Sequence, residues 1–323
     1  MERLFEDIRT KLPHDICIDV IVNKYVSQGF WQRLYDSMRA AQRQGHINHV
    51  TGDVHYLTYF LSKKRTILTI LDCVTLERLK GFKRWLYWLL WYWLPEKRCS
   101  AITVISNSTK IELLKYLKCR PEKIHVIHCP VSSEFSPSTK VFNHSCPRIL
   151  QVGTSPNKNL PRIAEALEGF NCTLSIIGQI SNEQLYAFTK YGLSFECHTN
   201  LSREDVVAQY HQSDIIMFAS LYEGFGLPIL EANATGRPVI TSNIYSMPEV
   251  AGDAACYVDP YDAMAIRKAV FKIATDDVYR NQLIQTGFVN VERFRLQEIS
   301  DQYARLYWKV ISETCPLDFC FSQ

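Results

Sequence analysis

The sequence lacks paired cysteines, zinc-site spacing and a secretion signal. Its 11 cysteines are scattered singly, with no CxxC pair and no His and Cys residues at zinc-ligand spacing. An odd, dispersed set is typical of reduced thiols in a cytoplasm rather than of a disulfide framework. Residues 1–7 carry three acids where a signal peptide needs a basic start followed by an apolar run. These absences predict a cytoplasmic protein.

Other absences narrow the set of ligands. The sequence contains no Asp-x-Asp pair of the kind that holds a metal ion, and none of the usual nucleic-acid-binding motifs. Its 323 residues are 47% apolar and 21% charged, which suits two globular domains and excludes the disordered and fibrous classes. We therefore expect no metal site, no cofactor and no nucleic-acid partner.

The charge is divided unevenly along the chain. Residues 1–137 hold 21 Lys and Arg against 13 Asp and Glu, a balance of +8, whereas residues 138–323 hold 15 against 20, a balance of −5. A basic front half predicts contact with something anionic, either a membrane surface or an acidic acceptor.

Both halves alternate short β-branched runs with amphipathic helical runs, the pattern of parallel sheets covered by helices. Residues 129–148 contain three prolines and little periodicity, which predicts a linker. We expect two Rossmann-like α/β domains, residues 1–137 and 138–295, with a C-terminal helix at 296–323 joined to the first. The ten predicted strands are 16–21, 47–50, 66–71, 101–105, 123–127, 149–153, 173–178, 215–219, 239–241 and 256–258.

The chain opens with a predicted helix rather than a strand. Leu4, Phe5, Ile8 and Leu12 fall on one helical face ahead of the first predicted strand. A doubly wound domain ordinarily begins with a strand and a glycine-rich turn. The first domain is therefore predicted to lack its first strand.

The strongest motif is segment 223–231, Glu-Gly-Phe-Gly-Leu-Pro-Ile-Leu-Glu, directly after the predicted strand 215–219. Its two glycines allow a tight turn, and Pro228 suits the first turn of a helix that Gly236 would end. A helix N-terminus offers free N–H groups and a positive dipole end to a diphosphate. Glu223 and Glu231 could then reach different parts of one ligand. A pair of surface acids around a tight turn is the alternative.

This segment resembles the E-x7-E motif of retaining glycosyltransferases of family 4, which have the two-domain GT-B fold. The likeness covers nearly the whole chain. Its other elements are Val152-Gly153-Thr154 with Lys158-Asn159, Ser213-Asp214, Gly236-Arg237-Pro238-Val239, Met247-Pro248-Glu249-Val250-Ala251-Gly252, His49-Val50-Thr51-Gly52-Asp53-Val54-His55-Tyr56 and Thr103-Val104-Ile105-Ser106.

The resemblance implies roles for the matching residues. Glu223 resembles the glutamate that binds the sugar, Glu231 the one that takes the ribose diol, and Lys158 the basic residue on the donor diphosphate. Lys158 would neutralise charge on the departing nucleotide; a solvated loop lysine is the alternative. Thr154 stands where many members have Arg. The donor-binding residues implied in this way are Gly153, Thr154, Lys158, Asn159, Glu223, Gly224, Phe225, Gly226, Leu227 and Glu231.

Polar residues also cluster in the front half. His49, Asp53 and His55 follow one another around the end of a predicted strand, and members of the wider family place a histidine or an acid near here, against the transferred sugar. We expect Asp53 and His55 to act with Glu223 and Lys158 in catalysis; structural histidines are the alternative. Asp72 follows the strand 66–71, where the family pattern is often His-Asp and this chain has Leu-Asp.

Residues 85–94 form a run of ten apolar or aromatic residues with Lys and Arg at both ends. The run is too short to span a bilayer. Either it is a helix buried against the front sheet, or its outer aromatic face rests in a membrane interface, anchored by the flanking cations. The second alternative would suit a lipid-linked acceptor and a peripheral position on the inner face of the membrane.

The resemblance implies a metal-independent, retaining transfer of a sugar from a GDP- or UDP-linked donor to a glycan or lipid-linked acceptor, in polysaccharide or cell-envelope synthesis. The nucleotide-sugar would be a substrate, not a cofactor. The missing strand and Thr154 support a rival, a truncated or weakly catalytic nucleotide-sugar-binding homologue. A sugar-nucleotide epimerase would share the fold, but the E-x7-E motif counts against it.

Overall fold

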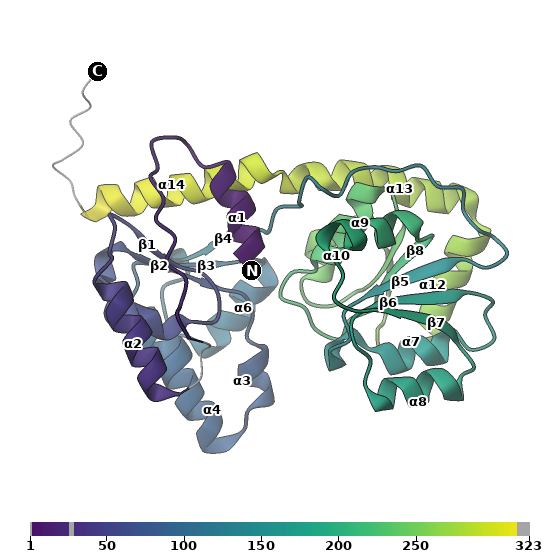
Figure 1. Ribbon diagram of the computed structural model, residues 1–323, viewed down its shortest axis with the longest axis horizontal. Helices are drawn as coiled ribbons and strands as arrows, with labels where there is room; N and C mark the ends of the chain where they lie inside the picture. The colour runs from purple at the N-terminus through teal and green to yellow at the C-terminus, as the bar shows by residue number, and fades with distance from the viewer. Residues whose placement is uncertain (1, 26–28, 315–323) are drawn as a thin grey trace. The chain divides into compact units, whose positions relative to one another are not determined.

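The computed structural model describes residues 2–25 and 29–314, and the chain divides into two compact units (Figure 1). Unit 1 comprises Met1–Pro130 and Leu296–Gln323, and unit 2 comprises Val131–Arg295. The chain thus leaves unit 1 at residue 130, rather than at 137, and returns to it at residue 296.

Unit 1 is built on a parallel sheet. Within the described residues, this sheet has four strands in the order β1-β2-β3-β4, and each neighbouring pair is parallel. Every residue of β2 and β3 is buried, as expected of parallel strands that carry helices on both faces. The strands are β1 (Asn48–Val50), β2 (Thr66–Ile70), β3 (Ala101–Val104) and β4 (Ile124–Val126).

The last helix within the described residues belongs to unit 1. Its apolar residues recur every three or four positions, and this face packs with α1 on one side of the sheet in a cluster that contains Phe5, Ile8, Ile67, Ile299 and Tyr303. The helices of unit 1 are α1 (Glu2–Thr10), α2 (Phe30–Ala41), α3 (Val74–Arg78), α4 (Gly81–Trp88), α5 (Leu94–Lys97), α6 (Asn107–Tyr116) and α14 (Leu296–Thr314).

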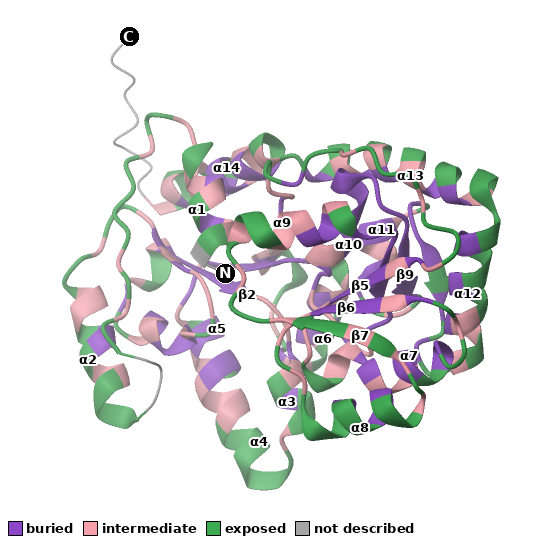
Figure 2. Cartoon of the chain, turned by 45° about the vertical axis from the view of Figure 1, so that its right-hand side comes forward, coloured by how far each residue is buried: buried purple, intermediate pink, exposed green. Residues whose placement is uncertain are grey.

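Unit 2 is built on a larger parallel sheet. Within the described part of the chain, its strands lie in the order β10-β9-β8-β5-β6-β7. Side chains from its strands and from the helices against them form a large buried apolar cluster, and Figure 2 shows the buried residues in purple. The strands are β5 (Arg148–Val152), β6 (Thr173–Ile177), β7 (Ser194–His198), β8 (Ile215–Phe218), β9 (Val239–Ser242) and β10 (Cys256–Val258). The helices are α7 (Leu160–Ala166), α8 (Asn182–Lys190), α9 (Arg203–Gln212), α10 (Leu227–Thr235), α11 (Met247–Ala251), α12 (Ala263–Thr275) and α13 (Asp277–Val291).

Nine of the ten predicted strands form, within a residue or two at each end. The strand predicted at 16–21 is wrong: this segment is not in a sheet, and Ile18 and Val20 are exposed. A β-branched run becomes a strand only where a partner strand pairs with it. Strand β7 has no apolar run and was not predicted, because it is an edge strand whose residues are largely exposed and polar.

Among the described residues, no helix is both long enough and apolar enough to cross a membrane. The apolar run at 85–94 is divided between α4, a π-helical turn (Leu89–Trp93) and α5.

His49 lies inside β1, and both of its ring nitrogens are engaged within unit 1. Nδ1 is 2.8 Å from the hydroxyl of Tyr307 on α14, and Nε2 is 2.7 Å from the hydroxyl of Thr69 on β2. Burial lowers the pKa of His49 to about 3, so the ring is neutral at pH 7. These contacts support the structural alternative for His49, because strand β1 points its ring at the neighbouring strand and α14.

We predict that His49 makes unit 1 sensitive to mild acid. In the unfolded chain its pKa is near 6.5, so below that pH the unfolded state binds a proton that the folded state does not. The free energy of unfolding should therefore fall as pH drops from 6.5 toward 3, by up to about 2 kcal/mol between pH 6.5 and 5 from this residue. An NMR titration of the imidazole checks the cause, and a midpoint near 6.5 in the folded protein would contradict it.

Candidate active site

The loop between β8 and α10 has the geometry expected of segment 223–231. Gly226 caps α10 with a φ of 109°, a conformation that residues with a side chain rarely adopt. A Cβ atom there would lie only 3.1 Å from Ile229 Cδ1 and 3.3 Å from Phe218 Cε1. Pro228 occupies the first turn, and Gly236 ends the helix in the left-handed region. The loop therefore presents the N-terminus of α10 at the carboxyl edge of the sheet.

Lys158 and Glu223 form an ion pair at this edge. The Lys158 Nζ atom is 2.6 Å from Glu223 Oε1, and each side chain is about 15% exposed. The Asn157 amide donates to the same carboxylate oxygen at 3.2 Å and to the Tyr222 carbonyl at 2.9 Å. Lys158 Nζ also lies 4.6 Å from the centroid of the Phe218 ring. The pair thus joins the loop after β5 to the loop after β8. Strands β5 and β8 are neighbours in the sheet.

Gly153 and Asn159 shape the loop that carries Lys158. Gly153 has a φ of 85°, and a Cβ atom there would lie 3.0 Å from Lys158 Cε. Asn159 has a φ of 61° and begins α7. Its buried amide donates to the carbonyls of Ala219 and Pro260 at 3.1 and 2.7 Å. The Asn159 side chain therefore holds loops together, and contact of Asn159 with the donor stays a prediction.

Thr154 also ties two loops together. Its hydroxyl donates to the carbonyl of Gln179 at 2.7 Å, and its own carbonyl accepts from the Gln184 amide at 2.7 Å. A Cβ atom on Gly178 would lie 2.9 Å from Thr154 Cγ2, so the loop after β6 passes close by. The proton of the Thr154 hydroxyl thus already has a hydrogen-bond acceptor within the protein.

Glu231 lies one turn into α10 and accepts a hydrogen bond from the hydroxyl of Tyr210 on α9. Burial raises the pKa of Glu231; the Tyr210 hydrogen bond and the charges of Arg203 and Lys158 oppose this effect. The pKa of Tyr210 is also raised, by its burial and by Glu231, so its hydroxyl stays protonated and remains a donor. Tyr210 thus fixes one oxygen of the carboxylate.

Ser246 is a supporting residue that the sequence did not predict. Its buried hydroxyl lies 2.8 Å from the carbonyl oxygens of both Glu223 and Phe225, so it braces the loop before α10 from the start of α11. Phe225 itself is buried, and its ring packs against Phe294 at a centroid distance of 5.8 Å. Tyr210 and Ser246 are distant in sequence from the motif, and no local pattern distinguishes them.

The front-half candidates lie at the carboxyl ends of β1 and β2 in unit 1. Asp53 is exposed and accepts a hydrogen bond from the Trp91 indole at 2.8 Å. His55 is buried, and its Nδ1 is 2.6 Å from the Trp91 carbonyl; burial lowers its pKa. Burial raises the pKa of Asp72, and the nearby charge of Asp53 raises it further. Asp53 is thus open to a ligand, whereas the buried His55 ring favours a structural role over substrate contact.

Two family models match the chain, one on each half. Residues 133–289 match "Glycosyl transferases group 1", and residues 20–135 match "Glycosyltransferase Family 4".

Curated relatives match at moderate identity. The chain is 38% identical to an O-antigen chain mannosyltransferase B of Escherichia coli over 104 residues, 32% of this chain and 27% of that protein. It is 29% identical to the serotype-specific mannosyltransferase WbdA of Escherichia coli over 215 residues, 58% of this chain and 26% of that protein. The chain thus spans about a quarter of the length of these two relatives.

Solved structures share the fold. An Anabaena HepE in complex with UDP-glucose superposes with a TM-score of 0.75 at 15% identity, covering 95% of this chain and 88% of that one. WaaG, a glycosyltransferase involved in lipopolysaccharide biosynthesis, gives 0.70 at 16% identity and covers 95% of each chain. These structures support the expected GT-B architecture of two parallel-sheet α/β units. With the E-x7-E geometry and the family matches on both halves, the chain belongs to the group 1, or family 4, glycosyltransferases.

Proposed function

We propose that the chain is a retaining, metal-independent glycosyltransferase that moves mannose from a GDP- or UDP-linked donor to a glycan or lipid-linked acceptor of a cell-envelope polysaccharide. The observation that carries this proposal is the Lys158–Glu223 pair beside the N-terminus of α10. The choice of mannose is supported by the names of the bacterial relatives, which are mannosyltransferases.

In this proposal the ion pair opens when the donor binds. Glu223 accepts hydrogen bonds from sugar hydroxyls, and Lys158 turns to the diphosphate together with the N–H groups at the start of α10. Glu231, fixed by Tyr210, takes the ribose hydroxyls. Lys158 then stabilises the negative charge that builds on the departing nucleoside diphosphate.

The proposed transfer proceeds on one face of the sugar. The bond from the anomeric carbon to the phosphate oxygen breaks, the bond to the acceptor oxygen forms, and the departing phosphate takes the acceptor's proton. Retention by way of a glycosyl-enzyme would require paired carboxylates about 5 Å apart. Glu223 instead faces a lysine and an asparagine, which supports the direct route. We assign exposed Asp53 of unit 1 to the acceptor side.

A second candidate, a nucleotide-sugar-binding homologue with weak transfer, is favoured by one observation. Thr154 stands where many family members have a cation, and its hydroxyl donates a hydrogen bond to the Gln179 carbonyl. Phosphate stabilisation then rests on Lys158 and backbone amides.

We predict that Glu223→Gln folds and binds the free nucleotide but loses transfer. It should lower kcat by about a hundredfold or more, because a charged acceptor of the sugar hydroxyls is replaced by a neutral amide with one acceptor oxygen where charge develops. Radiolabelled transfer assays check the rate and calorimetry checks nucleotide binding. Glu204→Gln, an exposed glutamate on α9, is the matched control. Transfer by Glu223→Gln at the rate of the parent would refute the assignment.

Removal of metal should leave the reaction unchanged. In the proposed site the diphosphate charge is met by the Lys158 ammonium and backbone N–H groups, so EDTA should alter neither donor binding nor turnover. The measurement is the transfer rate before and after chelation, followed by addition of manganese or magnesium. Strict dependence on either added ion would contradict this description of the site.

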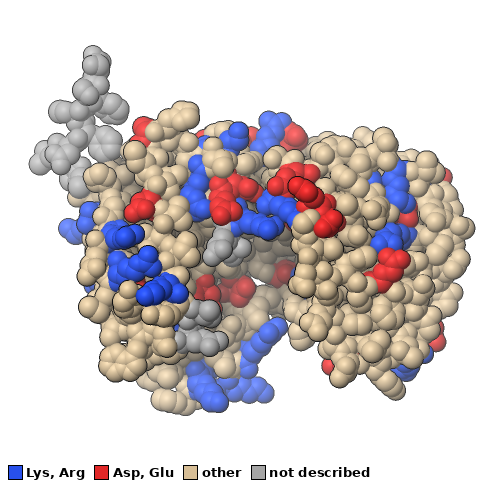
Figure 3. Space-filling view, in the orientation of Figure 1, with Lys and Arg blue, Asp and Glu red and all other residues tan. Residues whose placement is uncertain are grey.

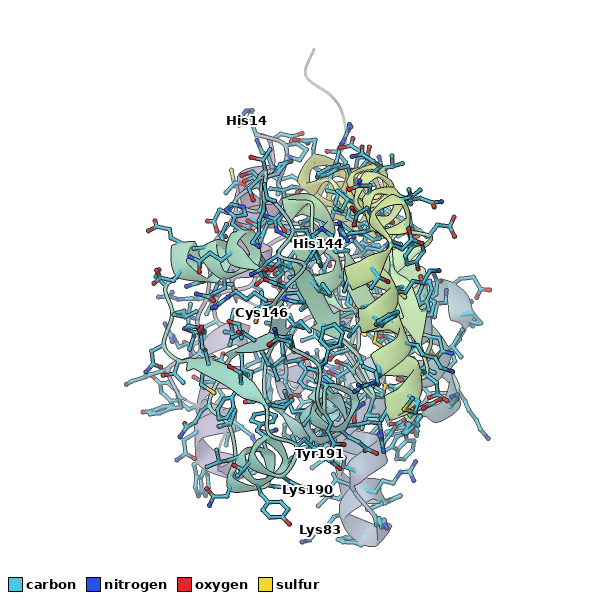
Figure 4. All side chains as sticks on the ribbon, turned by 90° about the vertical axis from the view of Figure 1, so that its right-hand side faces the viewer. His14, Lys83, His144, Cys146, Lys190 and Tyr191 are labelled. Atoms are coloured by element: carbon cyan, nitrogen blue, oxygen red, sulfur yellow. The ribbon has the colours of Figure 1, made fainter. Side chains whose placement is uncertain are left out.

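We also propose that the first turn of α4 rests on anionic membrane. Phe82 and Trp85 are 71% and 50% exposed and stack at a centroid distance of 5.6 Å, with exposed Lys80, Lys83 and Arg84 around them. Figure 3 shows basic side chains at this end of unit 1, and Figure 4 shows Lys83 at the outer end of the helix. Farther along, Trp91 and Tyr92 are buried, which supports the core alternative for that part of the run.

Exchange of Lys80, Lys83 and Arg84 for Gln should weaken binding to acidic vesicles by about 1 kcal/mol per charge. Co-sedimentation at low salt measures the effect. The same exchange at Lys63, Lys64 and Arg65 removes equal charge from another basic triplet of unit 1 and is the control. Equal losses in both triple variants, or no sedimentation of the parent protein, would contradict a specific role for α4.

A further inference from the structure

Tyr245 has a backbone conformation that aromatic residues rarely adopt. It lies between β9 and α11 with a φ of 55°, in the left-handed region. For a bulky residue this is an outlier that persists only where the surrounding structure enforces it, and such outliers gather at ligand sites. Ser246, the next residue, supplies that constraint, because its hydroxyl contacts the carbonyls of Glu223 and Phe225.

The constraint places the Tyr245 ring beside the loop that carries Glu223. Its centroid is 4.7 Å from that of Tyr222, and the two rings are inclined at 56°. Tyr222 is 9% exposed, whereas Tyr245 is 40% exposed. The inner ring is therefore packed into unit 2, and the outer ring keeps a surface open at the same sheet edge as the ion pair.

A hexose offers an aromatic ring one matching surface. Its hydroxyls need polar partners such as Glu223, but one face of the pyranose consists mainly of C–H groups. That face packs well on an aromatic ring, by dispersion and by removal of apolar surface from water. A carboxylate that binds the hydroxyls and a neighbouring ring that packs on the C–H groups would together recognise the polar and the apolar surfaces of a sugar.

We propose that Tyr245 is the aromatic platform on which the hexose of the donor lies, and that it fixes the sugar against Glu223. This inference rests on the proposed function and deepens it, since it adds a residue that distinguishes nucleotide-sugar from nucleotide. A glycine in place of Tyr245 would relieve the strain of the positive φ but remove the ring.

Substitution by glycine removes both the ring and the backbone strain, and two measurements report on these two changes. Tyr245→Gly relieves the strain of the positive φ but loses the packing of the ring on Tyr222, so its thermal midpoint should stay close to that of the parent protein. The same variant should weaken binding of the intact donor about tenfold, the order expected of one stacked ring, and leave the affinity for the nucleoside diphosphate unchanged. Tyr245→Phe should bind like the parent protein. Tyr186→Ala, which removes a 71% exposed ring on α8, is the control for loss of an aromatic side chain.

The measurement is calorimetry of each variant with GDP-mannose and GDP, and with UDP-glucose and UDP. Loss of affinity for the sugar-linked form alone supports the platform. Equal affinity of Tyr245→Gly and the parent for both forms would overturn it, and so would a lower midpoint with equal losses for both forms, which would show a structural role. Failure of the parent protein to bind either nucleotide would instead refute the proposed function.

Discussion

The ion pair between Lys158 and Glu223 is the contact on which the site depends. Parallel pairing of β5 with β8 brings together two loops that lie 65 residues apart in sequence, and the pair joins them at 2.6 Å. Each side chain is mostly buried, so each charge would be costly without its partner. The close approach requires Gly153, where a Cβ atom would press on Lys158, and Gly226, where one would press on Phe218. Strand order, glycine positions and charge pairing therefore specify one geometry.

Neutral donors from neighbouring elements complete this geometry. Ser246 braces the carbonyls before α10, Tyr210 fixes Glu231, and Asn157 donates to Glu223. Because the pKa of Tyr210 is raised, its hydroxyl remains a donor at neutral pH. The carboxylates are thus oriented before a ligand arrives, which reduces the ordering cost of binding. Unit 1 uses the same principle when the Trp91 indole fixes Asp53.

Local patterns in the sequence predicted most of the strands and the motif that places Glu223, Lys158 and Glu231. Strand–loop–helix order and glycine spacing are local properties, so they can be read directly. The supporting residues could not be found in this way, because Tyr210 and Ser246 reach the motif only through strand order and helix packing. The strand predicted at 16–21 was wrong because β propensity is a local property, whereas a strand also needs a partner strand that the local sequence does not show. The ring of His55 was likewise placed by a distant residue, Trp91.

The ion pair also bears on which ligand the site prefers. Arg162 donates to Asn159 and Pro260, and Arg203 pairs with Glu134, so these guanidinium groups are engaged within unit 2. A diphosphate that takes Lys158 leaves Glu223 without its cation, which is costly for a mostly buried carboxylate. A sugar with free hydroxyls restores hydrogen bonds to that carboxylate, whereas a nucleoside diphosphate alone does not. In the proposed function, this exchange would favour the intact donor over the spent nucleotide and would help the product to leave.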